Sequence, residues 1–175
     1  IAFWYTRHTR YGSPPMRWRL VDRIHEVDRD RFIAGTVCFS SDLELFQDHF
    51  PGFPVVPGVV LMESLAQLAG KLIGYSVRQA RGDWPFPILS MMQGVKFRKF
   101  VRPGEEVRLE ARVVSLREES AVMDVRAWVA GRTVAQAEQT FVFNAVPLAT
   151  PAEGERLERI ERAELARLWP EYPDD

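Results

Sequence analysis

Residues 57–77 read Pro-Gly-Val-Val-Leu-Met-Glu-Ser-Leu-Ala-Gln-Leu-Ala-Gly-Lys-Leu-Ile-Gly-Tyr-Ser-Val, and the rest of the chain is best interpreted from this stretch outward. From Val59 to Val77 only Glu63 and Lys71 are charged. The length of the stretch, the proline at its start and its leucine, alanine and methionine content favour a helix over a strand. Because a helix that is apolar on nearly all sides belongs in an interior, we expect one buried helix here.

The segments on either side of this helix have the pattern of β-strands. Residues 32–39 are rich in strand-forming side chains, and apolar residues alternate with polar ones over 107–113, 121–129 and 133–143. Ala130-Gly131-Arg132 is typical of the hairpin turn that joins the last two strands. One buried helix followed by antiparallel strands predicts an α+β domain in which a sheet wraps a single helix.

The two ends of the chain differ from this domain, which we place at residues 16–147. Residues 1–15 show no clear period, and we interpret them as an N-terminal arm, either native or left by cloning. From residue 148 on the chain is highly charged, and Thr150, Pro151 and Glu153 form the start signal of an amphipathic C-terminal helix. This helix packs on the domain's own surface or on a partner. Its apolar stripe comprises Leu157, Ile160, Leu165 and Leu168.

Composition excludes several classes of function. The 175 residues carry 23 Lys and Arg against 24 Asp and Glu, so the net charge of −1 gives no sign of a nucleic-acid partner. No uncharged apolar stretch is long enough to span a membrane. Cys38 is the single cysteine, which favours a reducing, cytoplasmic location, and its apolar neighbours predict that it is buried.

Glu63 is the most informative residue of the buried helix. A carboxylate in such an apolar helix is costly when ionised, which suits a general acid. Helical spacing makes Gln67 its nearest hydrogen-bonding neighbour, a supporting residue. The alternative is a glutamate at the solvent edge of the helix, or one paired with Lys71 or an arginine.

Two further groups lie just before Glu63 in the chain. His49 precedes a loop stiffened by Pro51 and Pro54, although a lone histidine is also common at surfaces and in cores. Pro57 and Gly58 start the helix, where a free N–H at the positive end of the dipole binds an oxyanion, unless the pair only ends the loop. A base, an N–H donor and an acid are what β-elimination beside a thioester requires. No metal cluster and no cofactor motif accompanies them.

The run His49-Phe50-Pro51-Gly52-Phe53-Pro54-Val55-Val56-Pro57-Gly58-Val59, followed by Glu63-Ser64-Leu65-Ala66-Gln67-Leu68-Ala69-Gly70, resembles the signature of the 3-hydroxyacyl-acyl-carrier-protein dehydratases of the FabZ type. Residues 20–24 and 95–105 resemble the family's opening strand and its later strand and turn. The similarity covers about residues 17–146 and leaves both ends unexplained.

This resemblance implies a hot-dog fold and a homodimer, alone or as a trimer of dimers, whose sites take histidine from one subunit and the acid from the other. It implies that His49 is the base, Glu63 the acid or water-positioning group, and the Gly58 N–H the donor to the carbonyl of an acyl chain held on acyl carrier protein. Glutamate at position 63 favours the FabZ type over the FabA type, which carries aspartate. Phe53 stands where the family commonly has arginine and Val56 where methionine is frequent.

Two larger sets of residues are candidates for substrate and partner binding because of their positions near the site. Apolar residues near the site are candidates for the lining of an acyl tunnel, or are ordinary core: Val59, Val60, Leu89, Met91 and Met92. A basic run beside the site could dock the acidic carrier protein, or is a solvated strand edge: Lys96, Arg98, Lys99 and Arg102.

Two other functions fit the same fold. A thioesterase needs a carboxylate aimed at the thioester carbonyl, but not the set of His49, Gly58 and Glu63. A non-catalytic acyl-binding or assembly subunit would keep the shape and use the charged C-terminal helix as its interaction element. Incubation with a 3-hydroxyacyl thioester separates the three, because the products are an enoyl thioester, a free acid or neither.

Overall fold

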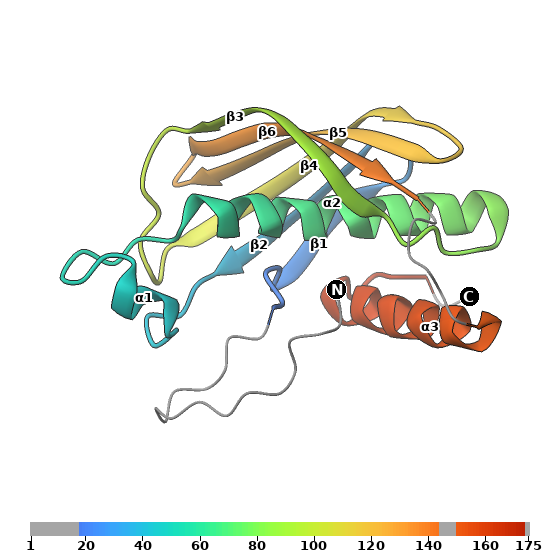
Figure 1. Cartoon of the computed structure of the whole chain (residues 1–175), viewed down its shortest axis with the longest axis horizontal. Coiled ribbons are helices and arrows are strands. Elements are labelled where there is room, and N and C mark those ends of the chain that lie inside the picture. Colours follow the sequence, from blue (N-terminus) through green and yellow to red (C-terminus); the bar gives the residue numbers. More distant parts are fainter. Residues whose placement is uncertain (1–17, 144–149, 174–175) are drawn as a thin grey trace.

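A computed structural model describes residues 18–143 and 150–173 of the chain, so the interpretation of residues 1–15 lies outside the described residues. Six strands, two longer helices and one short helix follow one another along the chain (Figure 1). In order they are β1 (Arg23–Asp28), β2 (Phe32–Cys38), α1 (Leu45–Asp48), α2 (Gly58–Arg81), β3 (Ile88–Phe97), β4 (Glu106–Leu116), β5 (Ser120–Val129), β6 (Arg132–Val142) and α3 (Pro151–Leu168).

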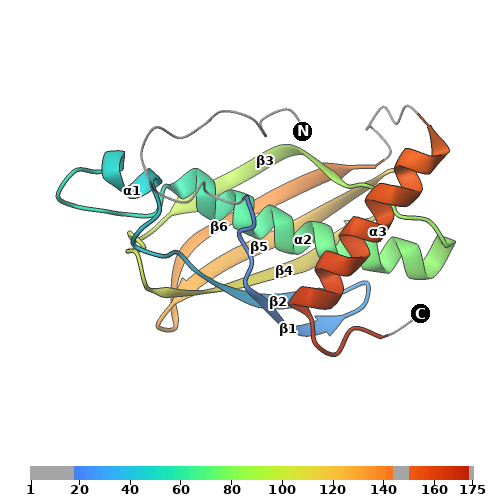
Figure 2. The same ribbon diagram turned by 90° about the horizontal axis from the view of Figure 1, so that it is seen from below.

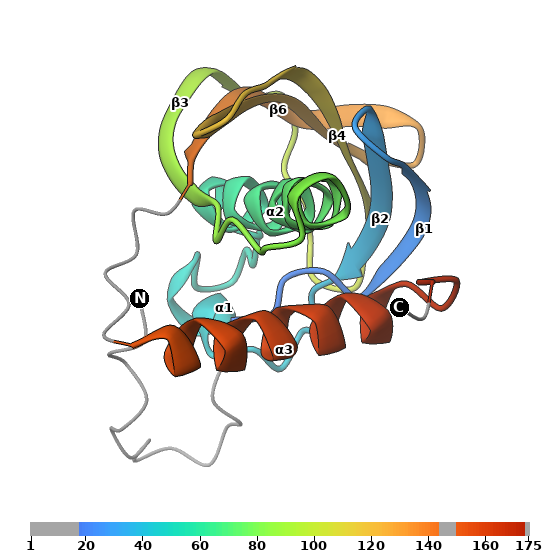
Figure 3. The same cartoon turned by 90° about the vertical axis from the view of Figure 1, so that its right-hand side faces the viewer.

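The strands form one antiparallel sheet in the order β1-β2-β4-β5-β6-β3. The sheet curls around α2, and α3 crosses the side of α2 that the sheet leaves open (Figure 3). The predicted α+β architecture is therefore confirmed, and so is the hairpin between β5 and β6. What the sequence did not indicate is that β3, which follows α2, pairs with β6 at the far edge of the sheet.

Strand alternation decides which face of the sheet meets the helix. On β4, Val107, Leu109 and Ala111 are fully buried, whereas the alternate residues Arg108 and Arg112 are exposed. Since successive side chains of a strand point to opposite faces, the apolar set turns toward α2 and the charged set turns outward. The core therefore lies between the concave face of the sheet and α2.

Helix α2 extends over 24 residues, longer than the apolar stretch that predicted it. Pro57 caps its start, and Gly82 ends it with a left-handed φ of 89° and an N–H bond to the Arg78 carbonyl. A Cβ at Gly74 would overlap the buried Trp84 indole, so only glycine allows the loop after the helix to pack there. Most of α2 is buried, as predicted.

Helix α3 packs on the domain's own surface, which confirms the first of the two alternatives for it. The Thr150 side chain accepts a hydrogen bond from the Glu153 N–H at 3.2 Å, as the start signal predicted. Leu165 and Leu168 are buried in the common core. Ile160 does not share their face: it is 52% exposed, so its assignment to the apolar stripe was wrong.

Ion pairs and aromatic rings fix α3 to α2. Glu161 pairs with Lys71 of α2 at 2.6 Å, and Glu158 pairs with Arg78 at 2.7 Å. After the end of α3, Trp169 packs edge-on against Tyr75 at 5.5 Å between ring centroids. The charges of α3 therefore serve partly to cover the outer face of the buried helix.

Cys38 is exposed, so the prediction that it is buried was wrong. It ends β2 one position after the buried Val37, and strand alternation turns it to the opposite face. Apolar neighbours in the sequence indicated a strand, not which of its faces is covered. Among the described residues, no helix is both long enough and apolar enough to cross a membrane.

Candidate active site

Gly58 begins α2, and its N–H has no intrahelical acceptor because it belongs to the first turn. The Val60 and Leu61 N–H groups already donate to the Pro57 carbonyl, at 2.9 and 3.3 Å. A Cβ at Gly58 would lie 2.7 Å from the ring of Phe97 at the end of β3. Glycine therefore allows the Phe97 ring to pack against the start of the helix, beside an N–H that is free to bind an oxyanion.

His49 follows α1 at the start of a loop whose main chain is cross-linked to itself. The Phe50 and Phe53 main chains exchange hydrogen bonds of 3.2 and 2.9 Å, and the Val55 N–H donates to the His49 carbonyl at 3.1 Å. The half-buried imidazole stacks on the Phe50 ring, with centroids 4.3 Å apart. The loop thus holds the histidine in one place, as its prolines predicted.

The two departures from the dehydratase signature both have a structural role. Phe53 packs edge-on against Phe100 at 6.0 Å, and the Arg102 guanidinium lies 5.1 Å from the centre of its ring. Val56 is buried, and its N–H donates to the Val101 carbonyl at 2.8 Å. An aromatic and cation–π contact thus stands where the family commonly places an arginine.

Glu63 lies one and a half turns into α2 and is half-buried. Its Oε1 accepts a hydrogen bond from Gln67 Nε2 at 3.0 Å, which confirms the predicted neighbour. Lys71, the alternative partner, pairs with Glu161 instead. Among the described residues Glu63 forms no ion pair.

His49 and Glu63 share no hydrogen bond or ion pair within the described part of the chain. With 3.6 residues per turn, Glu63 points about 140° around the α2 axis from Gly58. Gly58 faces the Phe97 ring, whereas Glu63 is hydrogen-bonded to Gln67, which in turn contacts the main chain of Trp18 and Leu20. Within a single chain, Glu63 and Gly58 therefore lie on different sides of α2.

The segment Trp18–Leu20 is part of this site, and sequence reasoning missed it. The Leu20 N–H donates to Gln67 Oε1 at 2.9 Å, and Gln67 Nε2 donates to the Trp18 carbonyl at 3.2 Å. Both contacts use the main chain, so no side-chain pattern could have revealed them. Only the polarity of Gln67 in an apolar helix indicated that it needed partners.

The candidate tunnel residues divide between core and surface. Val60 is buried and Leu89 is half-buried, whereas Val59, Met91 and Met92 are exposed, with Val59 at 72%. Every residue of β3 is at least partly exposed. A second surface must therefore cover these side chains before they can enclose an acyl chain.

The basic run lies on β3 and the turn after it, and all four of its side chains, Lys96, Arg98, Lys99 and Arg102, are exposed. Arg98 donates to Gln136 of β6 at 3.0 Å, and Arg102 covers Phe53. This cationic edge is close to the start of α2 because Phe97, within the run, touches Gly58.

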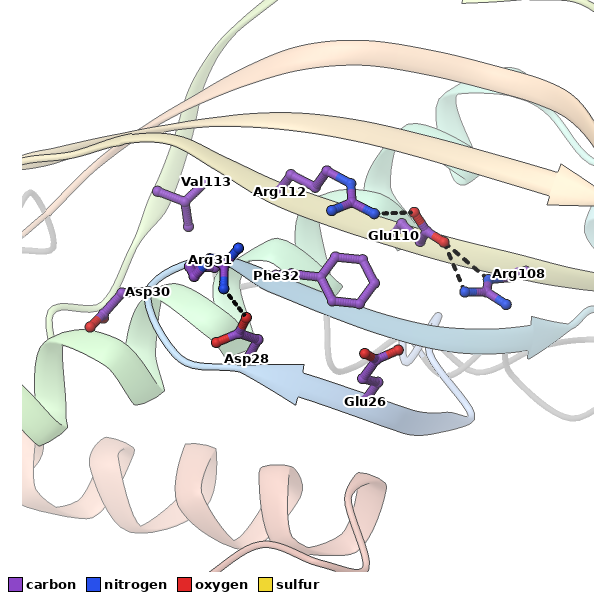
Figure 4. A pocket seen from close by; sticks show the side chains of 9 residues that line it. All are labelled: Glu26, Asp28, Asp30, Arg31, Phe32, Arg108, Glu110, Arg112 and Val113. Carbon is purple, nitrogen blue, oxygen red and sulfur yellow. Dashed lines mark hydrogen bonds and ion pairs between the residues drawn. The ribbon is translucent and has the colours of Figure 1, made fainter.

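A shallow hollow of about 450 Å³ lies on the outer face of β1, β2 and β4 (Figure 4). Glu110 pairs there with Arg108 at 2.9 Å and with Arg112 at 3.5 Å, and the Arg112 guanidinium also covers the Phe32 ring at 4.5 Å. These groups largely satisfy one another, and the strands that carry them turn this face away from α2. The hollow is a surface charge network rather than part of the site.

Comparison with known proteins assigns the family. Residues 13–138 match the FabA-like domain. The chain belongs to the FabA-like family. Within this family, the 3-hydroxyacyl-[acyl-carrier-protein] dehydratase FabZ of Thermus thermophilus is 41% identical over 128 residues, which make up 71% of this chain and 85% of that protein. The FabZ of Pediococcus pentosaceus is 38% identical over 125 residues, 71% of this chain and 82% of that protein.

Solved structures confirm the hot-dog fold for this FabA-like chain. The dehydratase heterocomplex ApeI:P from Xenorhabdus doucetiae superimposes with a TM-score of 0.61 at 16% identity, over 80% of this chain and 89% of that chain. A hypothetical thioesterase from Streptococcus pneumoniae, solved with coenzyme A, has a TM-score of 0.54 at 17% identity, over 70% and 87%. At such identities the likeness concerns the fold alone, so it does not favour either named activity. Helix α3 begins beyond the FabA-like match.

Proposed function

We propose that the protein removes water from (3R)-3-hydroxyacyl groups carried on acyl carrier protein and releases the trans-2-enoyl thioester, as in fatty-acid biosynthesis. The observation that carries this proposal is the state of Glu63: a half-buried carboxyl in a buried helix, hydrogen-bonded to an amide and not to any described cation. Such a group is free to hold and deliver a proton. The curated relatives at 35–41% identity carry the same activity in their names.

Each of the three groups has one part in the elimination. His49 accepts the proton from C2, next to the thioester. The Gly58 N–H donates to the thioester oxygen as negative charge develops on it. Glu63 gives its proton to the C3 hydroxyl, so the C2–H and C3–O bonds break, the C2–C3 double bond forms and water departs. Gln67 supports Glu63, and Pro57 sets the start of the helix that presents Gly58.

The complete site forms in a homodimer in this proposal, with His49 and Gly58 from one subunit and Glu63 from the other. The opposite directions of Gly58 and Glu63 on α2 support it, because one chain presents them to different sides. The exposed edge of β3 supports it as well: β3 pairs with β6 on one side only, and an edge strand with exposed Met91, Met92 and Phe97 is a template for pairing with a second copy. Pairing there would also cover the tunnel candidates.

A complementation assay tests this two-chain site. His49→Ala and Glu63→Gln are each prepared alone and are expected to be inactive. When the two variants are refolded together, half of the dimers are mixed, and each mixed dimer has one intact site of two, so the mixture should recover about a quarter of wild-type activity. A site within one chain would recover none, and that result would overturn the proposal.

The acyl carrier protein is proposed to dock on the cationic edge formed by Lys96, Arg98, Lys99 and Arg102. The exposure of these side chains beside Gly58 supports this, because an acidic carrier would be steered to the start of α2. Charge reversal at Lys99 and Arg102 should raise KM for carrier-bound substrate several-fold, and this effect should weaken at high salt. A short pantetheine thioester should be dehydrated as before. Unchanged KM for the carrier-bound substrate would count against docking at this edge.

Product analysis separates dehydration from the other functions of this fold. With a 3-hydroxyacyl thioester, enoyl product supports the proposal. Free acid would indicate a thioesterase, and recovery of unchanged substrate would indicate a subunit that only binds acyl chains. Full activity of either His49→Ala or Glu63→Gln would overturn the mechanism even if enoyl product formed.

A further inference from the structure

The chain before β1 crosses α2 (Figure 2), and its main chain contacts Gln67, the hydrogen-bonding neighbour of the proposed acid. Three hydrogen bonds connect the two: Leu20 N–H to Gln67 Oε1 at 2.9 Å, Gln67 Nε2 to the Trp18 carbonyl at 3.2 Å, and Gln67 Nε2 to Glu63 Oε1 at 3.0 Å. We name residues 18–20 the strap. The Gln67 amide is thus held between the strap and Glu63, with all three of its strong contacts assigned.

The strap leaves the amide only one orientation. A main-chain N–H can only donate and a main-chain carbonyl can only accept, so the amide oxygen must face Leu20 and the nitrogen must face Trp18. The second hydrogen of the same nitrogen is then directed at Glu63 Oε1. An isolated Glu–Gln pair could reverse its amide, but the strap removes that freedom.

We propose that the strap is a positioning element for the acid: it fixes the Gln67 amide as a donor to Glu63 Oε1 and thereby assigns the acid proton to Oε2. The –NH₂ group of Gln67 can only donate, and the hydroxyl oxygen of a carboxylic acid is a weaker acceptor than its carbonyl oxygen, so a proton on Oε1 would weaken this hydrogen bond. A proton on Oε2 keeps that bond and leaves the O–H free for the substrate hydroxyl. This inference rests on the proposed dehydration.

The strap itself is anchored on two sides. Leu20 and Val21 are buried in the core, and the Asp22 N–H donates to the Thr36 carbonyl at 2.9 Å. On the other side, Arg19 lies 3.6 Å from Glu164 of α3. The C-terminal helix, which the FabA-like match does not include, therefore reaches the acid through Arg19, the strap and Gln67.

Two variants at position 67 test the orientation. Gln67→Met keeps the length of the side chain but removes both donor and acceptor, so kcat should fall about tenfold, which is less than the roughly 10²–10⁴-fold that a general acid itself contributes, while KM changes less than about twofold. Gln67→Glu keeps an acceptor for Leu20 but, when ionised, offers no donor to Glu63. Its kcat relative to wild type should rise as the pH is lowered and residue 67 gains a proton, whereas the ratio for Gln67→Met should stay flat.

A matched pair at Leu20 tests the strap. Leu20→Ala and Leu20→Pro both remove the buried side chain, but only proline removes the N–H that donates to Gln67. Thermal unfolding measures the stability that both variants lose with the buried leucine side chain. The kcat should be several-fold lower in Leu20→Pro than in Leu20→Ala. Equal kcat values in the pair, or wild-type kcat in Gln67→Met, would overturn the inference. Failure of the wild type to form enoyl product would instead overturn the proposed function on which it rests.

Discussion

Truncation of Leu165 to alanine should show that α3 is an integral part of the domain. Leu165 is 1% exposed, and it lies on the only face of α3 that reaches the common core. Leucine-to-alanine changes in cores cost about 2–5 kcal/mol, and a surface helix can settle over the gap, so we expect the lower part of that range, about 2–3 kcal/mol. For a chain of this length that loss lowers Tm by about 4–12 °C.

Ile160→Ala provides the matched control on the same helix. Its side chain has the same number of carbons but is 52% exposed, so its loss should change the free energy of unfolding by less than about 0.5 kcal/mol. Both variants are unfolded in urea, with tryptophan fluorescence as the signal, at one protein concentration. Equal stabilities of Leu165→Ala and Ile160→Ala would refute the packing of α3 described above.

Three further changes follow from contacts within the domain. Arg167 lowers the pKa of Glu164 below its ordinary 4.5, mainly through a side-chain hydrogen bond and also through its charge. Arg19 and Lys71 add smaller effects in the same direction, and burial opposes them. Replacement of this carboxylate in Glu164→Gln should therefore lower the free energy of unfolding by about 0.5–1 kcal/mol at pH 7. The contribution of a lowered carboxyl pKa is complete above the ordinary value of 4.5 and is lost as the pH falls through the folded-state pKa, so the stabilities of the two proteins in urea titrations should converge as the pH is lowered below 4.5. Gly74→Ala should destabilise by about 1–3 kcal/mol, because its Cβ overlaps Trp84, and thermal unfolding would show a Tm equal to wild type if that indole does not pack there. Gly58→Ala should lower kcat, because the added Cβ displaces the Phe97 ring from the start of α2. Phe97→Ala in the same chain should restore part of the lost kcat. If the double variant shows no such rescue, the ring is not the cause of the lower kcat.

The sequence predicted elements and their order better than it predicted partners. The polarity of Glu63 and Gln67 in an apolar helix predicted that the two side chains are hydrogen-bonded, because such residues are costly unless they are bonded, and the structure shows that bond. The contacts of Trp18 and Leu20 with Gln67 could not be predicted, since they come from main-chain groups that every residue carries. Periodicity also does not say which strand lies at the edge of a sheet, so the position of β3 beside β6 could not be predicted.

The errors at Cys38 and Ile160 have one physical origin. Both residues lie in apolar or amphipathic stretches. Sequence spacing assigns each residue to a face of its helix or strand, but it does not say how much of that face is covered by other parts of the protein. In the structure the buried side chains of α3 are limited to Leu165 and Leu168. Cys38 is the last residue of β2, and its side chain lies on the face of the sheet that is exposed there. Only the positions of the neighbouring elements determine these limits.

The irregular course of β3 has a consequence for the newly made chain. Between Gln93 and Lys96 the register with β6 shifts, and Gly94 adopts a left-handed φ of 58°. A kinked strand with lysine and arginine close to its end can pair with one matching strand, but it is a poor template for the addition of many strands in succession. Before its edge is covered, the new chain is therefore protected from amyloid-like aggregation through this strand. Straightening this strand by deletion of Gly94 would extend the flat, apolar run through Met91 and Met92, and the expected cost is insolubility during expression.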